Sequence, residues 1–446
     1  MRKLSIGDMD CTSQFVGGAL SWSADGKQLA FLHHPPSDVT IGLYVLSLDS
    51  MEVTPVKTDC KLVMLPAFSP RGEYLAWACA DNPNSVPVYL RRLSDGKITR
   101  LLRSVQGVGG LAWSGDGSRI VFSTGFVGGD LWEVSLDRPN RPQKQPFGHD
   151  AKDVAVSVTG HRLAFKQTHT NTNIWRLDLS QPNAPAQKIV ASSREQVAPN
   201  YSPDGTQIAF MSNRSGNTEI WVSDSDGSNA VQLSSFGVDA TGTPHWSPDG
   251  KLIAFDSRVG GESSIYLVEP RAGVPHKLDI DISGNETPSW SHDGNWIYFT
   301  NGDDAGNPTI WKVPPSGGHA VQVAKRDAWW PLESPDGQHV YFCRDAKVWQ
   351  VKTDGTDEQQ IPGTSLVGCD EWHPFASGIY FLTYTNNKFE IDHFDLTTKE
   401  VRTIHVLDKF PPDWMGGLSA SPDGRWLLFA QMDEFSSDLM MVENWQ

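Results

Sequence analysis

Two histidines occupy equivalent positions in a sequence repeat of about 45 residues, and both could act as metal ligands. His245 lies in Pro244-His245-Trp246, and His373 lies in Trp372-His373-Pro374. Neutral imidazole is a common ligand of divalent ions. The two histidines come from repeats three apart, so a wide ring would hold them too far apart to share one ion. A polar residue on a channel wall is the favoured interpretation, and a divalent metal is the alternative.

A nucleophilic serine of the hydrolase type is not indicated. The Gly-x-Ser-x-Gly elbow is absent, and the nearest approach is the segment 417–421, Gly-Leu-Ser-Ala-Ser, on a predicted inner strand. A recurring Asp-Gly pair also invites a catalytic or calcium-binding interpretation. However, Asp before Gly in a turn hydrogen-bonds nearby backbone amides, which explains its recurrence. These turn aspartates are Asp204, Asp249, Asp293, Asp336 and Asp423. We expect no catalytic residue.

Tryptophans and charged residues in predicted loops form a candidate binding surface. The chain consists of repeats that are each expected to form four strands. Within each repeat, the loop between the second and third strands and the loop before the first strand should emerge on the same face of the protein. Such loops commonly carry function. Aromatic anchors with charged rims are typical of protein or sugar recognition. Alternatively, the tryptophans pack under their own loops. The candidate residues are Asn213, Arg214, Asp256, Arg258, Asp327, Trp329, Trp330, Arg344, Trp372, Asp413 and Trp414.

A period of about 45 residues organises the whole chain of 446 residues. The clearest copies are residues 199–210, 244–255 and 288–299, in which an aromatic residue and Ser precede a turn that ends in Asp-Gly. The copies at Gly160 and Gly378 are degenerate. The aligned turn glycines are Gly26, Gly72, Gly117, Gly160, Gly205, Gly250, Gly294, Gly337, Gly378 and Gly424. This spacing predicts ten repeats.

Each repeat has the pattern of four short strands. In one copy these are the residues before Ser202, then 208–210, 219–222 and 230–233, separated by turns and polar loops. Such a meander is the blade of a β-propeller. We therefore expect one all-β domain over residues 1–446, a single closed propeller of ten blades. Residues 1–5 resemble a fourth strand, and the last repeat lacks one, so we expect the N-terminal strand to join the last blade and close the ring. Two smaller rings are the alternative.

Composition and charge exclude several functions. The net charge is −16, from 37 basic and 53 acidic side chains, which argues against nucleic-acid binding and favours a basic or neutral partner. No apolar run reaches 18 residues, so no membrane insertion is expected. We expect a monomer that binds a protein, a peptide or a carbohydrate.

The cysteines and the N-terminus bear on the compartment. Five cysteines are far apart and include no CxxC pair, so neither a disulfide framework nor a zinc site is indicated. Residues 1–10 contain no apolar segment of a secretory signal. The chain is therefore cytoplasmic as given, or periplasmic if it is part of a longer membrane-anchored protein.

The segment 202–222, SPDGTQIAFMSNRSGNTEIWV, strongly resembles the TolB-like, or PD40, subclass of WD40-like propeller repeats. The ending at 418–444 resembles the C-terminal sensor-like region of CadC-type winged-helix regulators of acidobacteria. In such regulators a DNA-binding domain, and often a membrane helix, precedes the propeller. TolB-like propellers also accompany prolyl-oligopeptidase domains, but the repeats here leave no room for a hydrolase domain.

These resemblances imply a fold more strongly than a function. We expect a non-enzymatic binding, sensing or protein-interaction module that engages its ligand at the channel mouth and the loop face, without a cofactor. The alternative is a metal-dependent carbohydrate-active enzyme, a lyase or hydrolase, because some propeller lyases hold a metal with channel histidines. A third interpretation is a scaffold for a peptide partner.

Overall fold

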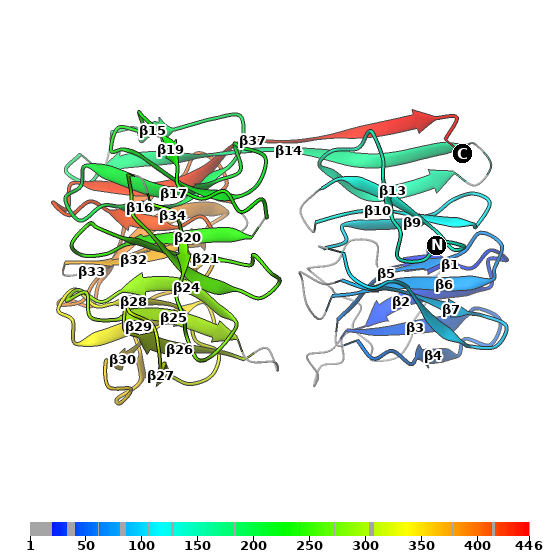
Figure 1. Cartoon of the computed structure of the whole chain (residues 1–446), viewed down its shortest axis with the longest axis horizontal. Helices are drawn as coiled ribbons and strands as arrows, with labels where there is room; N and C mark the ends of the chain where they lie inside the picture. Colours follow the sequence, from blue (N-terminus) through cyan, green and yellow to red (C-terminus); the bar gives the residue numbers. More distant parts are fainter. Residues whose placement is uncertain are drawn as a thin grey trace. The chain divides into compact units, whose positions relative to one another are not determined.

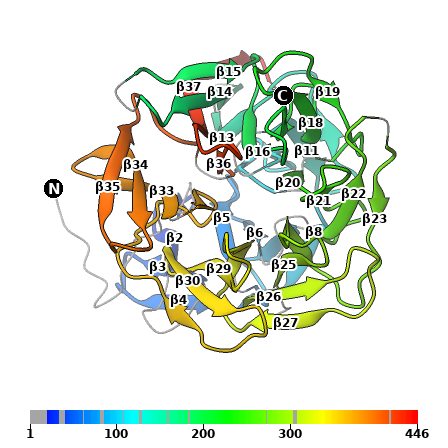
Figure 2. The same ribbon diagram turned by 90° about the vertical axis from the view of Figure 1, so that its left-hand side faces the viewer.

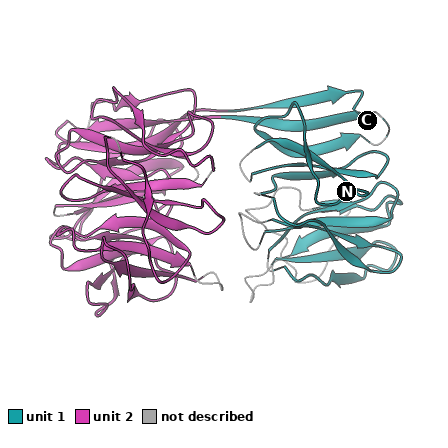
Figure 3. Ribbon diagram, viewed as in Figure 1, with its two compact units in different colours: residues 1–169, 436–446 teal, residues 170–435 magenta. Residues whose placement is uncertain are grey.

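The computed structural model consists of β-strands joined by turns and loops (Figure 1). No helix that could cross a membrane occurs in the part of the chain that it describes. The chain divides into two compact units, residues 1–169 with 436–446 and residues 170–435 (Figure 3), where we expected a single domain. The described residues are 20–33, 41–60, 62–80, 86–105, 107–125, 129–157, 159, 161–181, 184–238, 240–271, 273–302, 307–376, 378–412 and 415–445.

Residues 170–435 form six sheets arranged around a common centre (Figure 2). The inner strands contact one another in the order β16, β20, β24, β28, β32 and β36, and β36 contacts β16. We number the sheets one to six in that order. Sheets one to five are β16–β19 (Gln196–Tyr201, Gln207–Ser212, Glu219–Asp224, Val231–Gln232), β20–β23 (Thr241–Trp246, Ile253–Ser257, Ser264–Val268, His276–Lys277), β24–β27 (Asn285–Trp290, Ile297–Gly302, Pro308–Val313, Val321–Ala324), β28–β31 (Trp329–Glu333, His339–Arg344, Lys347–Lys352, Gln359–Gln360) and β32–β35 (Trp372–Phe375, Gly378–Thr385, Lys388–Asp395, Val401–Val406).

The first unit contains three four-stranded sheets and part of a fourth. Its inner strands contact one another in the order β1, β5, β9 and β13. The expected pairing of residues 1–5 with the last sheet lies outside the described residues. The sheets are β1–β4 (Leu20–Trp22, Gln28–His33, Gly42–Ser47, Val53–Val56), β5–β8 (Val63–Phe68, Tyr74–Cys79, Val88–Arg92, Ile98–Leu102), β9–β12 (Gly110–Trp113, Arg119–Ser123, Leu131–Ser135, Gln143–Lys144) and a sheet that begins with β13 (Ala151–Ser157).

Two long strands explain why evenly spaced repeats give two units. β14 (Arg162–Asp178) and β37 (Trp426–Glu443) pair with each other, and each contributes residues to both units. Within the second unit, sheet six therefore consists of β36 (Leu418–Ala420), the first part of β37, the last part of β14, and β15 (Gln187–Val190). The repeats at Gly160 and Gly424 thus exchange their third strands. Neither 166–172 nor 431–437 contains Gly or Pro, so neither segment carries a strong signal for the turn that a separate blade would need.

The turn aspartates have the structural role that the sequence predicted. In the copy at Gly205, Ser202 Oγ donates to Asp204 Oδ1 (2.6 Å), which also accepts from Thr206 N (3.0 Å). Gly205 has φ +71°, a conformation that side chains disfavour. The aromatic residue before the turn packs on the preceding sheet, as Trp246 does against Ile220.

The expectation of unpaired cysteines is wrong. Cys60 is bonded to Cys79 and Cys343 to Cys369, across 19 and 26 residues of sequence. In each pair one cysteine lies on the second strand of a sheet and the other lies in the loop before a first strand. The meander returns that loop to the second strand, and sequence spacing alone does not reveal the approach.

Candidate functional site

A cavity of about 60 Å³ lies at the centre of the six sheets of residues 170–435. All six inner strands, or the residues directly before them, contribute to its wall. The volume has room for about four water molecules. Its wall includes Asn200, Ser289 and Leu332, together with His245 and His373, the two histidines that the sequence singled out.

Proline-containing bulges shape this wall. In β16, β20, β24 and β28 the strand pairing shifts at a bulge that contains a residue with φ between 50° and 59° followed by proline. Proline has no N–H and tolerates the unpaired position of a bulge. The left-handed residue costs about 1–3 kcal/mol, which the surrounding sheets must offset. The four pairs are Ala198-Pro199, Thr243-Pro244, Thr287-Pro288 and Trp330-Pro331.

Side chains on one inner strand hold the backbone of the next inner strand. Each accepts a hydrogen bond from a backbone N–H that would otherwise be buried without a partner. One of these bonds joins sheet six to sheet one. The bonds are Trp246 N to Asn200 Oδ1 (3.0 Å), Trp290 N to His245 Nδ1 (3.5 Å) and Tyr201 N to Ser419 Oγ (3.1 Å).

This arrangement gives His245 a structural role. Nδ1 accepts the Trp290 N–H over a long 3.5 Å, and a neutral ring with this bond carries its proton on Nε2. Burial lowers the pKa of His245 to about 4 and that of His373 to about 3, so both rings are neutral at pH 7. The two histidines lie on sheets two and five and line one cavity, but the described residues contain no group of three or more metal-ligating side chains.

Asp370 and Glu371 are neighbouring carboxyl groups directly before β32. Asp370 lines the cavity, and its Oδ2 accepts a hydrogen bond from Gly416 N (3.0 Å). Glu371 is 5% exposed, and its Oε1 has no hydrogen-bond partner among the described residues. Burial raises the pKa of both groups, and the charge of Asp370 raises that of Glu371 further. The sequence pattern places these two residues in the loop before β32 but does not show that Glu371 is buried.

The arginines expected on the loop face are engaged within their own sheets or with the next sheet. Arg214 donates to Gln196 Oε1 (2.6 Å) and lies over the ring of Trp221. Arg258 pairs with Glu286 (2.5 Å), and Arg344 pairs with Glu358 (2.5 Å). Asn213 accepts a bond from Glu195 N (2.9 Å). These side chains stabilise loops, and the hydrogen bonds and ion pairs that they form within the protein leave few of their polar groups for a ligand.

The predicted tryptophans do not form one surface. Trp372 is 1% exposed, and its Nε1 donates to Cys369 O (2.8 Å), so it belongs to the core. Trp372 and Trp330 both line the cavity, whereas Trp329 is 37% exposed. Asp327 is exposed and adopts φ 47°. Asp413 and Trp414 lie outside the described residues.

An aromatic patch that sequence reasoning missed lies instead on the hairpin of β33 and β34 in sheet five and on the loop before β36 in sheet six. Tyr384 is 54% exposed and Phe410 is 64% exposed. Their rings flank Phe389, at centroid distances of 4.7 Å and 5.7 Å. Tyr384 lies at the end of β33 and Phe389 at the start of β34, so they flank the loop between the second and third strands of sheet five, and Phe410 lies in the loop before β36.

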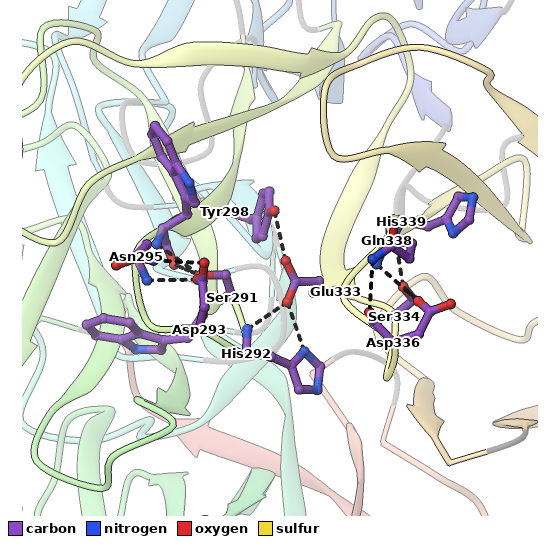
Figure 4. A network of polar contacts seen from close by, with 12 residues as sticks. Ser291, His292, Asp293, Asn295, Tyr298, Glu333, Ser334, Asp336, Gln338 and His339 are labelled. Carbon is purple, nitrogen blue, oxygen red and sulfur yellow. Dashed lines mark hydrogen bonds and ion pairs between the residues drawn. The ribbon is translucent and has the colours of Figure 1, made fainter.

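A second missed feature is a polar network between sheets three and four (Figure 4). Glu333 is buried where other repeats have an aromatic residue, and it accepts bonds from His292 N (2.6 Å), His292 Nδ1 (2.8 Å) and the Tyr298 hydroxyl (3.0 Å). His292 replaces the usual proline and thereby supplies the N–H, while Tyr298 replaces the small residue of Ala209 and Ala254. Tyrosine occupies this position in sheets four and five as well, so the departures peculiar to this place are His292 and Glu333, and their meeting is the signal that could have revealed the network.

This network predicts strong coupling between two positions. Glu333→Trp restores the repeat's aromatic residue but collides with Tyr298, so overpacking should destabilise the protein by about 1–3 kcal/mol or more. Tyr298→Ala alone leaves a cavity and removes the hydrogen-bond donor of Glu333 Oε1. The double variant has the residue types of sheets one and two, so its loss in urea unfolding should be at least about 1 kcal/mol smaller than the sum of the single losses. Additive losses would contradict this description.

Asp256 predicts a pH dependence of stability. It is buried on β21, where it accepts hydrogen bonds from the Thr243 hydroxyl and from Thr287 N (3.3 Å). Burial, and then the charge of Glu286, raise its pKa to about 7. Because ionisation is disfavoured in the folded state, this group's contribution is fully present below about pH 4 and is lost as the pH rises through about 7.

Asp256→Asn keeps an oxygen acceptor and removes the titration. Relative to the wild type, its free energy of unfolding should rise by about 1–4 kcal/mol between pH 4 and pH 8. Denaturant unfolding at both pH values measures this difference. A pH-independent difference between the two proteins would refute the assignment.

Comparison with known proteins agrees with a propeller architecture. Residues 161–374 match the family described as the TolB beta propeller domain. An uncharacterized protein of Agrobacterium fabrum is 33% identical over 138 residues, which are 27% of this chain and 47% of that protein. The chain thus spans about half the length of the curated relative that it matches.

Solved structures give more distant likenesses. TolB from Acinetobacter baumannii has a TM-score of 0.42 at 14% identity, with 84% of this chain and 81% of that chain covered. An oligogalacturonate lyase in complex with manganese has a TM-score of 0.32 at 16% identity, with 74% and 87% covered. Residues 161–374 are therefore TolB-like propeller repeats in an all-β chain of four-stranded sheets.

Proposed function

We propose that residues 170–435 form a closed six-bladed propeller that works as a non-enzymatic binding module for a protein or peptide. The observation that carries this proposal is the central cavity, to which all six inner strands contribute. Buried polar groups in and beside its wall have no hydrogen-bond partner among the described residues: Ser289 Oγ and Glu371 Oε1. Such groups are costly unless a ligand or water satisfies them. The match of residues 161–374 to TolB propellers supports the same class of function.

The aromatic patch of Tyr384, Phe389 and Phe410 supports a macromolecular partner. Large aromatic side chains are common anchors of protein interfaces, and two of these three are more than half exposed. A partner that covers this patch could place one end in the cavity, because the end of β33, the start of β34 and the starts of the inner strands lie on the same face of these antiparallel sheets. The resemblance of residues 418–444 to the sensor-like region of CadC-type regulators belongs to this proposal and rests on sequence alone.

The metal-dependent carbohydrate-active alternative has one supporting observation, the two histidines in one cavity. The hydrogen bond at His245 Nδ1 weighs against it, because coordination would require that bond to break or the ring to lose its proton. This alternative predicts that Mn²⁺ or Zn²⁺ raises the melting temperature and that His245→Ala or His373→Ala abolishes the rise. We expect no rise.

A cavity-filling variant tests the proposed function. Ser289→Val places an additional methyl group in or beside a cavity of about 60 Å³ and should abolish binding of peptides selected from a displayed library on the wild type. Ser316→Val, in an exposed turn between β26 and β27, is the matched control and should bind them as the wild type does. Affinities from calorimetry decide the question. If peptides bind Ser289→Val as tightly as the control, the central cavity is not their site.

A further inference from the structure

The described part of the cavity wall contains an acidic side chain and no positively charged one, which is the charge that a cation-binding site needs. Of the described residues that line it, Asp370 carries the one carboxyl group, and none is Lys or Arg. The two histidines in the wall are neutral at pH 7, as shown above. Oδ2 of Asp370 accepts the Gly416 N–H, and the backbone N–H groups of Asp370 and Met415 also act on this carboxyl group. A carboxylate offers about four lone-pair sites, so acceptor capacity remains for a ligand.

Glu371 adds a second carboxyl group next to the first. A Cβ on Gly416 would fall within 1.8 Å of Glu371 Oε1, so the carboxyl group lies directly against the backbone of Gly416. The neighbouring residues Met415 and Gly417 line the cavity. Both carboxyl groups therefore converge on one glycine segment of the wall, and the glycine is needed for this approach.

The acidic segment is held in place before any ligand arrives. The Cys343–Cys369 disulfide ties it to β29. Trp372 Nε1 donates to Cys369 O (2.8 Å), and Val367 N donates to Leu382 O (3.0 Å). A preorganised carboxylate loses little entropy on binding and therefore favours affinity.

Ser289 provides an independent indication of a ligand. It lies on β24, three sheets from β36, and lines the cavity; it is 1% exposed, yet its Oγ has no hydrogen-bond partner among the described residues. A hydroxyl oxygen and a carboxylate oxygen are both acceptors for N–H donors.

We propose that the cavity binds a primary ammonium group, the amino terminus or a lysine side chain of a peptide partner. This inference rests on the proposed binding function. An ammonium group supplies three donors on a compact cation, whereas the planar guanidinium fork favours a carboxylate with both oxygens free, and Oδ2 of Asp370 already accepts the Gly416 N–H. The net charge of −16 attracts the same class of partner.

Calorimetric titration of the full chain at pH 7 tests this inference with four small probes: trialanine, N-acetyl-trialanine, Nα-acetyl-lysine amide and its Nε-acetylated form. Trialanine, Nα-acetyl-lysine amide or both should bind at least about tenfold more tightly than the matched acetylated probe, because a charge-assisted hydrogen bond is lost on acetylation. Which of the two binds identifies the source of the ammonium group.

Asp370→Asn keeps the acceptor for Gly416 N and removes the charge, so it should weaken ammonium binding at least about tenfold. Asp357→Asn removes one exposed charge and should change the affinity less than about twofold. Ser289→Ala should also weaken binding, and circular dichroism checks that each variant is folded.

Two results would overturn the inference. Equal affinity for free and acetylated probes, with binding that Ser289→Val abolishes, would leave the cavity as a binding site and exclude ammonium selectivity. No binding of any probe, together with selected peptides that ignore Ser289→Val, would overturn both the inference and the proposed function.

Discussion

The hydrogen bonds between neighbouring inner strands determine the shape of the six-sheet unit. In an ordinary sheet, backbone N–H groups pair within the sheet, but here some pair with a side chain of the preceding sheet, such as Asn200, His245 or Ser419. This fixes the distance between inner strands and hence the size of the cavity that they enclose. It also links sheet six to sheet one, where Ala198 N further donates to Met415 O (2.9 Å).

The same constraint explains why few residues in the cavity wall are free for chemistry. His245 has the residue type of a metal ligand, yet its Nδ1 holds the next strand. The proline bulges reduce the number of backbone donors near the centre. Asp370 and Ser289 retain acceptor oxygens there, and both are held by rigid surroundings, which suits recognition of a small donor group better than bond-breaking chemistry.

Much of the local structure could be predicted from the sequence because the same short-range signals recur in most of the repeats. The Asp-Gly turns, the buried second strands and the aromatic residues between sheets are local, and they occur as predicted. The division into two units could not be predicted from the spacing of the repeats. The turn glycines remain about 45 residues apart, although β14 and β37 each run from one unit into the other, so that two repeats exchange their third strands. The segments 166–172 and 431–437 lack Gly and Pro, which is the one local sign of this exchange. The disulfides could not be predicted because their cysteines are distant in the sequence and only the folded sheets bring them together. His292 and Glu333 stand out only when the repeats are compared with one another.

Amide hydrogen exchange at Tyr201 tests the central claim most directly, because its N–H bonds to Ser419 across the junction of sheets six and one. The account predicts that this amide is protected in the wild type, and that Ser419→Ala accelerates its exchange while Trp246 N, held by Asn200, stays protected. Fast exchange of the Tyr201 amide in the wild type, or exchange that Ser419→Ala leaves unchanged, would contradict the account.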